Sequence, residues 1–110
     1  MLNSTPVKSM WLFAFFDLPV QTKKNKKDYT LFRKDLLAEG FLRLQYSVYA
    51  RFCESRERSL TALRRVKAAL PPEGEVRFLN VTDKQFSEQI IYLGSSRKNA
   101  EKPPEQLMLF

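Results

Sequence analysis

An uninterrupted apolar stretch, MWLFAFF from Met10 to Phe16, constrains the fold more than any other part of the sequence. Its length suits a β-strand, and Pro19 follows soon after it. Consecutive residues of a strand point to opposite faces, so a strand that is apolar throughout is typical of the centre of a sheet. The chain therefore has to supply packing partners for both faces of this strand.

The segments that follow predict a regular order of elements. A helix is expected from the N-cap Thr22 to the C′ residue Gly40, and then two strands within 41–53 that connect near 45–47. A second helix is expected after the N-cap Ser55 and ends at PPEG (71–74), and further strands are expected over 75–81 and 89–94. This order predicts an α+β fold, the ferredoxin-like βαββαβ arrangement with an additional C-terminal strand.

Two short helices cover only one face of such a sheet, so the other face favours a homodimer. The extra strand 89–94 either extends the chain's own sheet or joins the sheet of a neighbour. The domain is expected to span 10–94, after an N-terminal lead (1–9) and before a polar linker and docking peptide (95–110). The second helix is expected to turn these residues inward: Leu60, Leu63, Val66 or Lys67, and Leu70.

Composition excludes several kinds of chemistry. The chain has 110 residues, a formal charge of +7, no histidine and one cysteine, Cys53. A Ser-His or Cys-His dyad, an internal disulfide and a thiolate zinc site are therefore excluded. Catalysis would need carboxylates and a cation bound by oxygen. No apolar run is long enough to span a membrane and no secretory cleavage site follows the first one, so a cytoplasmic location is expected.

Basic residues are concentrated between Lys23 and Lys67. Lysines in the first turn of a helix are opposed by the helix dipole, which favours an anionic partner over a merely solvated surface. Because no base-reading module is visible, we expect contacts with the nucleic-acid backbone and a strong dependence on salt. The candidate nucleic-acid-binding residues are Lys23, Lys24, Lys26, Lys27, Arg33, Arg51, Arg56, Arg58, Arg64 and Arg65.

Asp17, directly after the apolar strand, has two interpretations. It is a turn residue before Leu-Pro, or it is a ligand of Mg²⁺, which takes one or two carboxylates together with water and phosphate. No second acid is near it in the sequence. A two-fold axis close to Asp17 would bring a second copy of this carboxylate to the site.

Four segments together resemble the CRISPR-associated small endoribonuclease family, the second core protein of the CRISPR spacer-acquisition machinery. They are FFDLP, TKKNKKDYTLFRKDLLAEGF, LQYSVYARFC and LPPEGEVRFLNVTDKQF, within a resemblance that covers Met10 to Gly94. The resemblance is strongest to versions that accompany RNA-guided type II systems. It implies a ferredoxin-like homodimer whose last strand pairs with the partner protomer.

The resemblance also implies functional roles. Asp17 matches the strand-end aspartate that binds a divalent metal, Mg²⁺ or Mn²⁺, one from each protomer. Members of the family are described as metal-dependent ribonucleases or deoxyribonucleases. Their dimer bridges two dimers of the CRISPR integrase and holds the duplex of a new spacer. No other functional residue of the family carries over individually.

The last residues form a short apolar peptide, QLMLF, after the polar segment. It is expected to dock on a partner through Gln106, Leu107, Leu109 and Phe110. One candidate partner is the CRISPR integrase subunit. The other is the replication sliding clamp, because QLMLF is similar to the pentapeptide by which bacterial proteins bind it; packing on the body of the domain, or no role, is the third alternative.

Three functions remain open at this point. The first is a DNA-binding subunit of a spacer-integration complex, with a metal-dependent nuclease site at paired Asp17. The second is a stand-alone endoribonuclease that uses the same metal. The third is a toxin-like RNA-binding or RNA-cleaving protein of the same fold, unrelated to CRISPR.

Overall fold

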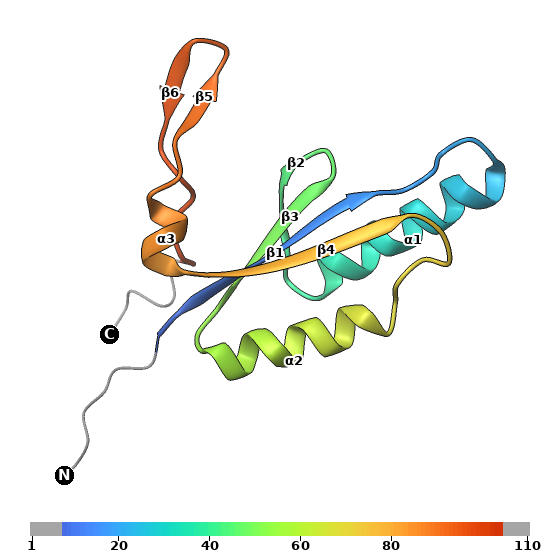
Figure 1. Cartoon of the computed structure of the whole chain (residues 1–110), viewed down its shortest axis with the longest axis horizontal. Coiled ribbons are helices and arrows are strands. Elements are labelled where there is room, and N and C mark those ends of the chain that lie inside the picture. Colours follow the sequence, from blue (N-terminus) through green and yellow to red (C-terminus); the bar gives the residue numbers. More distant parts are fainter. Residues whose placement is uncertain (1–7, 105–110) are drawn as a thin grey trace.

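A computed structural model describes residues 8–104. Its main sheet is antiparallel, has four strands in the order β2-β3-β1-β4, and carries the two long helices on one face (Figure 1). This is the expected α+β, ferredoxin-like arrangement. The elements are β1 (Met10–Asp17), α1 (Lys23–Ala38), β2 (Leu42–Gln45), β3 (Val48–Cys53), α2 (Arg56–Lys67), β4 (Glu75–Thr82), α3 (Asp83–Ser87), β5 (Ile91–Leu93) and β6 (Ser96–Lys98).

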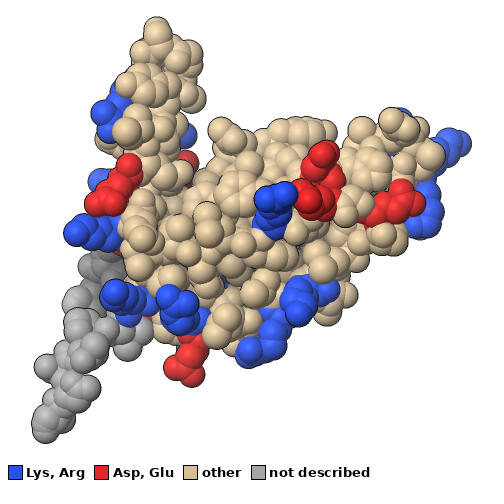
Figure 2. Space-filling model, in the orientation of Figure 1, with Lys and Arg blue, Asp and Glu red and all other residues tan. Residues whose placement is uncertain are grey.

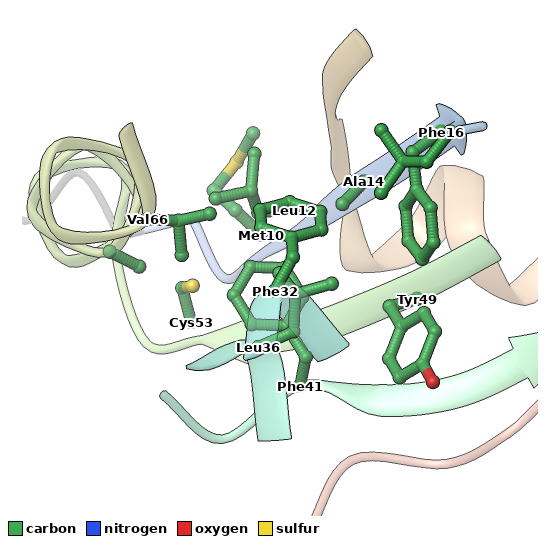
Figure 3. Packing of buried hydrophobic residues seen from close by; sticks show 12 residues of the cluster. Met10, Leu12, Ala14, Phe16, Phe32, Leu36, Phe41, Tyr49, Cys53 and Val66 are labelled. Carbon is green, nitrogen blue, oxygen red and sulfur yellow. The ribbon is translucent and has the colours of Figure 1, made fainter. Parts of the chain in front are cut away.

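Strand β1 lies between β3 and β4 and belongs to two apolar cores. Its even-numbered residues, from Met10 to Phe16, pack with Phe32 and Leu36 of α1 and Val66 of α2 (Figure 3). Its odd-numbered residues from Trp11 to Phe15 belong to a separate cluster on the opposite face. The apolar run is therefore central and apolar on both faces, as the sequence predicted.

Side-chain caps fix the starts of both long helices. The Thr22 side chain accepts a hydrogen bond from the Asn25 amide at 3.0 Å, and the Ser55 hydroxyl accepts one from the Arg58 amide at 3.1 Å. Both N-caps were predicted. After α1 the chain turns through Gly40, which has a positive φ of 89° that suits glycine.

The inward face of α2 differs from the predicted one. Val66 is buried and Leu63 packs against the core, as predicted, but Leu60 and Leu70 are exposed, and Ser59 and Ala62 are buried instead. The Ser59 hydroxyl lies 2.6 Å from the side-chain oxygen of Asn80 in β4 and donates a hydrogen bond to it. This hydrogen bond lets a polar residue occupy a fully buried position of α2. The expectation for Leu60 and Leu70 was wrong.

A short helix, α3, covers part of the other face of the sheet. The segment TDKQF forms this helix because the Thr82 side chain accepts a hydrogen bond from the Gln85 amide, and the Gln85 side chain accepts one from the Thr82 amide. Phe86 of α3 stacks on Trp11, with ring centroids 3.9 Å apart and planes 7° apart. The indole Nε1 of Trp11 donates a hydrogen bond to Asp83 at 2.8 Å.

The chain after α3 forms a hairpin, in which β5 lies within the strand expected over 89–94 and β6 lies within the segment expected to be a linker. Strand β5 pairs with β6 through a two-residue connection, Gly94 and Ser95, and the pair stands apart from the main sheet (Figure 1). The prediction of a polar linker was therefore wrong for Ser96–Lys98. Strand β5 does not extend the chain's own four-stranded sheet. Over the described part of the chain, no helix is both long and apolar enough to cross a membrane.

Candidate nucleic-acid and metal site

Asp17 is the last residue of β1 and is exposed, unlike the buried Phe16 and Leu18 on either side of it. Residues alternate between faces along a strand, so Asp17 lies on the same face as Trp11, Phe13 and Phe15. This is the face opposite the two long helices. The carboxylate therefore sits at one end of the sheet face for which the sequence predicted a second protomer.

The structure brings a second carboxylate close to Asp17. Glu75 begins β4 and is the direct cross-strand partner of Asp17, so both side chains project from the same face. Glu75 is exposed and accepts a hydrogen bond from Arg77 Nε at 3.1 Å. The hydrogen bond from Arg77 to Glu75, together with the attraction between their charges, raises the pKa of Arg77 above its usual value.

Sequence reasoning missed Glu75 as a site residue. The two acids are far apart in the chain, and only antiparallel pairing of the end of β1 with the start of β4 joins them. The sequence does indicate that Glu75 starts a strand, because it is the first residue after the PPEG segment that precedes β4.

The donor chemistry of this pair suits a hard cation. Mg²⁺ binds through one or two carboxylates and keeps several waters, and Asp17 and Glu75 offer carboxylate oxygens at the protein surface. Within residues 8–104, no three His, Cys, Asp or Glu side chains come together in a way that could hold a metal ion. Asp17 and Glu75 are therefore the residues that could contribute to a magnesium or manganese site, with further ligands supplied by water, phosphate or a second copy of the chain.

Most of the predicted nucleic-acid-binding residues lie on the helical layer, on the face opposite Asp17. Figure 2 shows Lys and Arg side chains along the edge formed by α2 and at the end of the molecule where α1 begins. No acidic residue is present in the first turn of α1. The helices carry Lys23, Lys24, Lys26, Lys27 and Arg33 on α1, and Arg56, Arg58, Arg64 and Arg65 on α2.

Two of these cations are already paired with acids. Lys24 donates a hydrogen bond to Asp28 at 2.8 Å, and this contact raises the pKa of Lys24 above its usual value. Arg65 lies 3.6 Å from Glu39. Such exposed pairs are weak, so both side chains can exchange these acids for phosphate.

Arg51 is not brought together with the lysines. It lies on β3 beside Gly40, which follows the C-terminal end of α1, and the lysines occupy the opposite end of this helix. A helix of this length separates its two ends by about 24 Å. Arg51 is half-buried and lies near the C-terminal part of α2 instead, because its neighbour Gly40 follows Glu39, which pairs with Arg65.

Two residues of the segment LQYSVYARFC, Ser47 and Tyr49, have structural roles. Tyr49 is fully buried in the core, and the Ser47 carbonyl accepts a hydrogen bond from the Phe16 amide at 3.0 Å. The expected docking residues Gln106, Leu107, Leu109 and Phe110 lie outside the described residues.

Comparison with known proteins gives a consistent result. The model of the family described as "CRISPR associated protein Cas2" matches residues 10–89. Proteins named CRISPR-associated endoribonuclease Cas2 from Parvibaculum lavamentivorans, Paracidovorax avenae and Flavobacterium psychrophilum are 48%, 45% and 41% identical to this chain. The matches cover 92%, 96% and 94% of this chain, and 100%, 98% and 90% of the respective relatives. The resemblance expected from the sequence is thereby confirmed, and the chain belongs to the Cas2 family of CRISPR-associated proteins.

Proposed function

We propose that the protein is a homodimeric subunit of the CRISPR spacer-acquisition complex, where it bridges integrase dimers and binds the duplex precursor of a spacer. The observation that carries this proposal is the gathering of lysines and arginines on the helical layer, away from the face of Asp17. A surface of this kind binds the phosphate backbone without reading sequence. It therefore suits a protein that holds duplexes of unrelated sequence.

Dimer formation is supported by apolar side chains on the face opposite the helices. Leu79 of β4 is exposed on this face, and Phe15 of β1 and its cross-strand partner Val48 are only half-buried. A groove between this face and the β5–β6 hairpin is lined by Phe15, Val48 and Leu93, among others. A second copy would cover these residues, and a two-fold axis near the end of β1 would bring the two Asp17 side chains together.

Asp17 is the proposed catalytic and metal-binding residue of a nuclease site, with Mg²⁺ or Mn²⁺ as the cofactor. When bound, such a cation supplies charge stabilisation at a phosphodiester and lowers the pKa of its water. Asp17, supported by Glu75, would hold it at the exposed end of β1. Arg77 donates hydrogen bonds to Glu75, so one cationic group lies next to this pair of carboxylates.

A stand-alone metal-dependent endoribonuclease is the second candidate function. It is favoured by the pairing of two exposed carboxylates within one chain, Asp17 and Glu75. The printed names of the relatives also describe endoribonucleases. The third alternative, a toxin-like protein unrelated to CRISPR systems, is dropped because the chain belongs to the Cas2 family.

The proposal also includes a partner for the C-terminal tail. The tail residues 106–110 would dock on the integrase subunit, or on the replication sliding clamp, in the cytoplasm. Titration of a QLMLF peptide against each partner separately distinguishes the two, and binding to neither rejects both. The proposal also assigns the protein to a type II CRISPR system. The presence of type II interference genes next to its own gene would test this assignment.

One experiment tests the leading function. Asp17→Ala is combined with the partner integrase and a spacer duplex, and integration and nuclease cleavage are measured in parallel. We expect integration to continue while metal-dependent cleavage is lost. Loss of integration by a normally folded, dimeric variant would contradict the scaffold function.

A further inference from the structure

A pocket of about 370 Å³ lies on the surface where the segment after β1 meets α1 and the β2–β3 connection. No acidic side chain is among the described residues of its lining. The loop at its edge is held in place, because the Phe16 amide at the end of β1 donates its hydrogen bond to Ser47, the neighbour of Tyr46. The lining residues are Val20, Lys26, Tyr29, Thr30, Arg33 and Tyr46.

Two tyrosines form the aromatic part of the pocket. Their ring centroids are 5.8 Å apart with planes at 28°, and the Tyr29 hydroxyl donates a hydrogen bond to the Tyr46 carbonyl at 3.3 Å. Tyr29 also contacts Phe16, so part of this residue serves the core. Tyr46 is 66% exposed, and burial in the core does not account for it.

Three cations surround these rings. Lys26 and Arg33 line the pocket itself, and the guanidinium carbon of Arg43 lies 5.2 Å from the centroid of the Tyr46 ring. The Nε of Arg33 is buried and has no hydrogen-bond partner among the described residues. A buried donor without a partner is costly, and an anionic ligand at this site is one way to satisfy it.

An exposed aromatic ring among cations is the combination that proteins use to bind unpaired nucleotides. The base stacks on the ring, and the cations hold the phosphate. A base pair inside a duplex cannot use such a site, because both of its faces are already stacked on neighbouring pairs. A pocket of this kind would select unpaired over paired bases, whereas the basic residues of the helices would contact the backbone of either form.

We propose that this pocket binds one unpaired nucleotide of a partly single-stranded nucleic acid. Its base lies on Tyr46, and its phosphate contacts Lys26 and Arg33. This inference rests on the proposed binding of a duplex through the basic helices, and it adds a preference for duplexes with unpaired ends.

The test compares two labelled DNA probes by fluorescence anisotropy at one salt concentration. One is a blunt duplex, and the other is the same duplex with short oligothymidine overhangs. The full-length protein is compared with Tyr46→Ala, with Tyr46→Phe, which keeps the ring, and with Leu37→Ala. Leu37 is the control, because it is also exposed but lies near the C-terminal end of α1, outside the pocket.

We expect the overhang to strengthen binding by the unmodified protein about fivefold or more, in line with one stacked base. Tyr46→Ala should lose this gain and keep its affinity for the blunt duplex, and Lys26→Gln should reduce the gain. Tyr46→Phe and Leu37→Ala should retain it. If the blunt duplex binds but the overhang adds no affinity, or if the gain survives in Tyr46→Ala, the proposal for the pocket is wrong, while the duplex-binding function stands. Failure of both probes to bind overturns the duplex-binding function and the pocket with it.

Discussion

Gly74 approaches the backbone of Asp17 so closely that a β-carbon on Gly74 would lie 2.8 Å from the Asp17 carbonyl oxygen. The same β-carbon would lie 2.7 Å from Leu18 Cδ2, and Gly74 has a φ of 97°. Both facts favour glycine at this position. Because Gly74, the last residue of PPEG, has no side chain, β4 can begin next to Asp17, the candidate metal ligand.

The first prediction concerns this close approach. Gly74→Ala should lower the free energy of unfolding by about 2 kcal/mol or more, because it combines backbone strain with a steric clash. Gly94→Ala is the matched control, since Gly94 also has a positive φ but a β-carbon there meets no described atom within 4 Å. Urea unfolding measures both variants. Equal decreases for the two would show that the approach to Asp17 is not under steric constraint.

The second prediction uses the single tryptophan as a reporter. Phe86→Ala removes the ring stacked on Trp11, so the free energy of unfolding should fall by about 3–5 kcal/mol. The fluorescence emission of Trp11, which is fully buried, should shift to longer wavelength. Ile90→Ala, just beyond α3 and exposed, should change neither quantity. Unaltered Trp11 emission in Phe86→Ala would mean that α3 does not cover this face in solution.

The third prediction separates the roles of the two carboxylates. Asp17→Asn keeps the size of the side chain and removes its charge, so divalent-dependent cleavage of RNA or DNA should fall about 100-fold or more. Glu75→Gln should raise the metal concentration needed for half-maximal cleavage by a smaller factor. Glu73→Gln serves as the control, because Glu73 is exposed nearby but does not pair with Asp17. Full activity of Asp17→Asn would show that this carboxylate is only a turn residue.

The fourth prediction concerns the basic surface. Replacing Lys23, Lys24, Arg56 and Arg58 by Gln should weaken duplex binding and reduce the slope of log affinity against log salt by about 0.9 for each phosphate that the protein no longer neutralises. A control variant with the same change in net charge replaces Lys84, Arg97, Lys98 and Lys102, which lie on or after α3. Its slope should change less. An unchanged slope for the first variant would place the nucleic acid on another surface.

The fifth prediction follows from Cys53, whose burial raises the pKa of its thiol above the usual value. The folded state then favours the protonated thiol, so this contribution to stability is complete below the pKa of the unfolded chain, about 8.5. It is lost as the pH rises through the folded pKa. Unfolding experiments should show stability falling in this alkaline range, with a weaker fall in Cys53→Ala. Parallel curves for the two proteins would contradict it.

The sequence was sufficient wherever a local signal determined the structure. The apolar run from Met10 predicted β1, and Thr22 and Ser55 predicted the helix starts, because capping depends on residues within one turn. Local signals for α3 and the hairpin were also present. Thr82 and Gln85 have the spacing of a capping box, and Gly94-Ser95 is a two-residue loop that commonly joins paired strands.

What the sequence could not supply depends on contacts between distant segments. Ser59 faces the sheet because Asn80 accepts its hydrogen bond, and no periodicity of α2 alone indicates this. Glu75 stands beside Asp17 only through the pairing of β1 with β4. Tyr46 joins Lys26 and Arg33 in one pocket because the loop that carries Tyr46 is held against the end of β1.

The alternation of β1 between two cores limits how this chain can change over evolution. Insertion or deletion of one residue between Met10 and Asp17 would reverse which residues face the helices and which face the opposite side. It would also move Asp17 to the wrong side of the sheet relative to Glu75. Relatives should therefore tolerate length changes in the segment around 18–22 or in the hairpin, while the number of residues in β1 stays fixed.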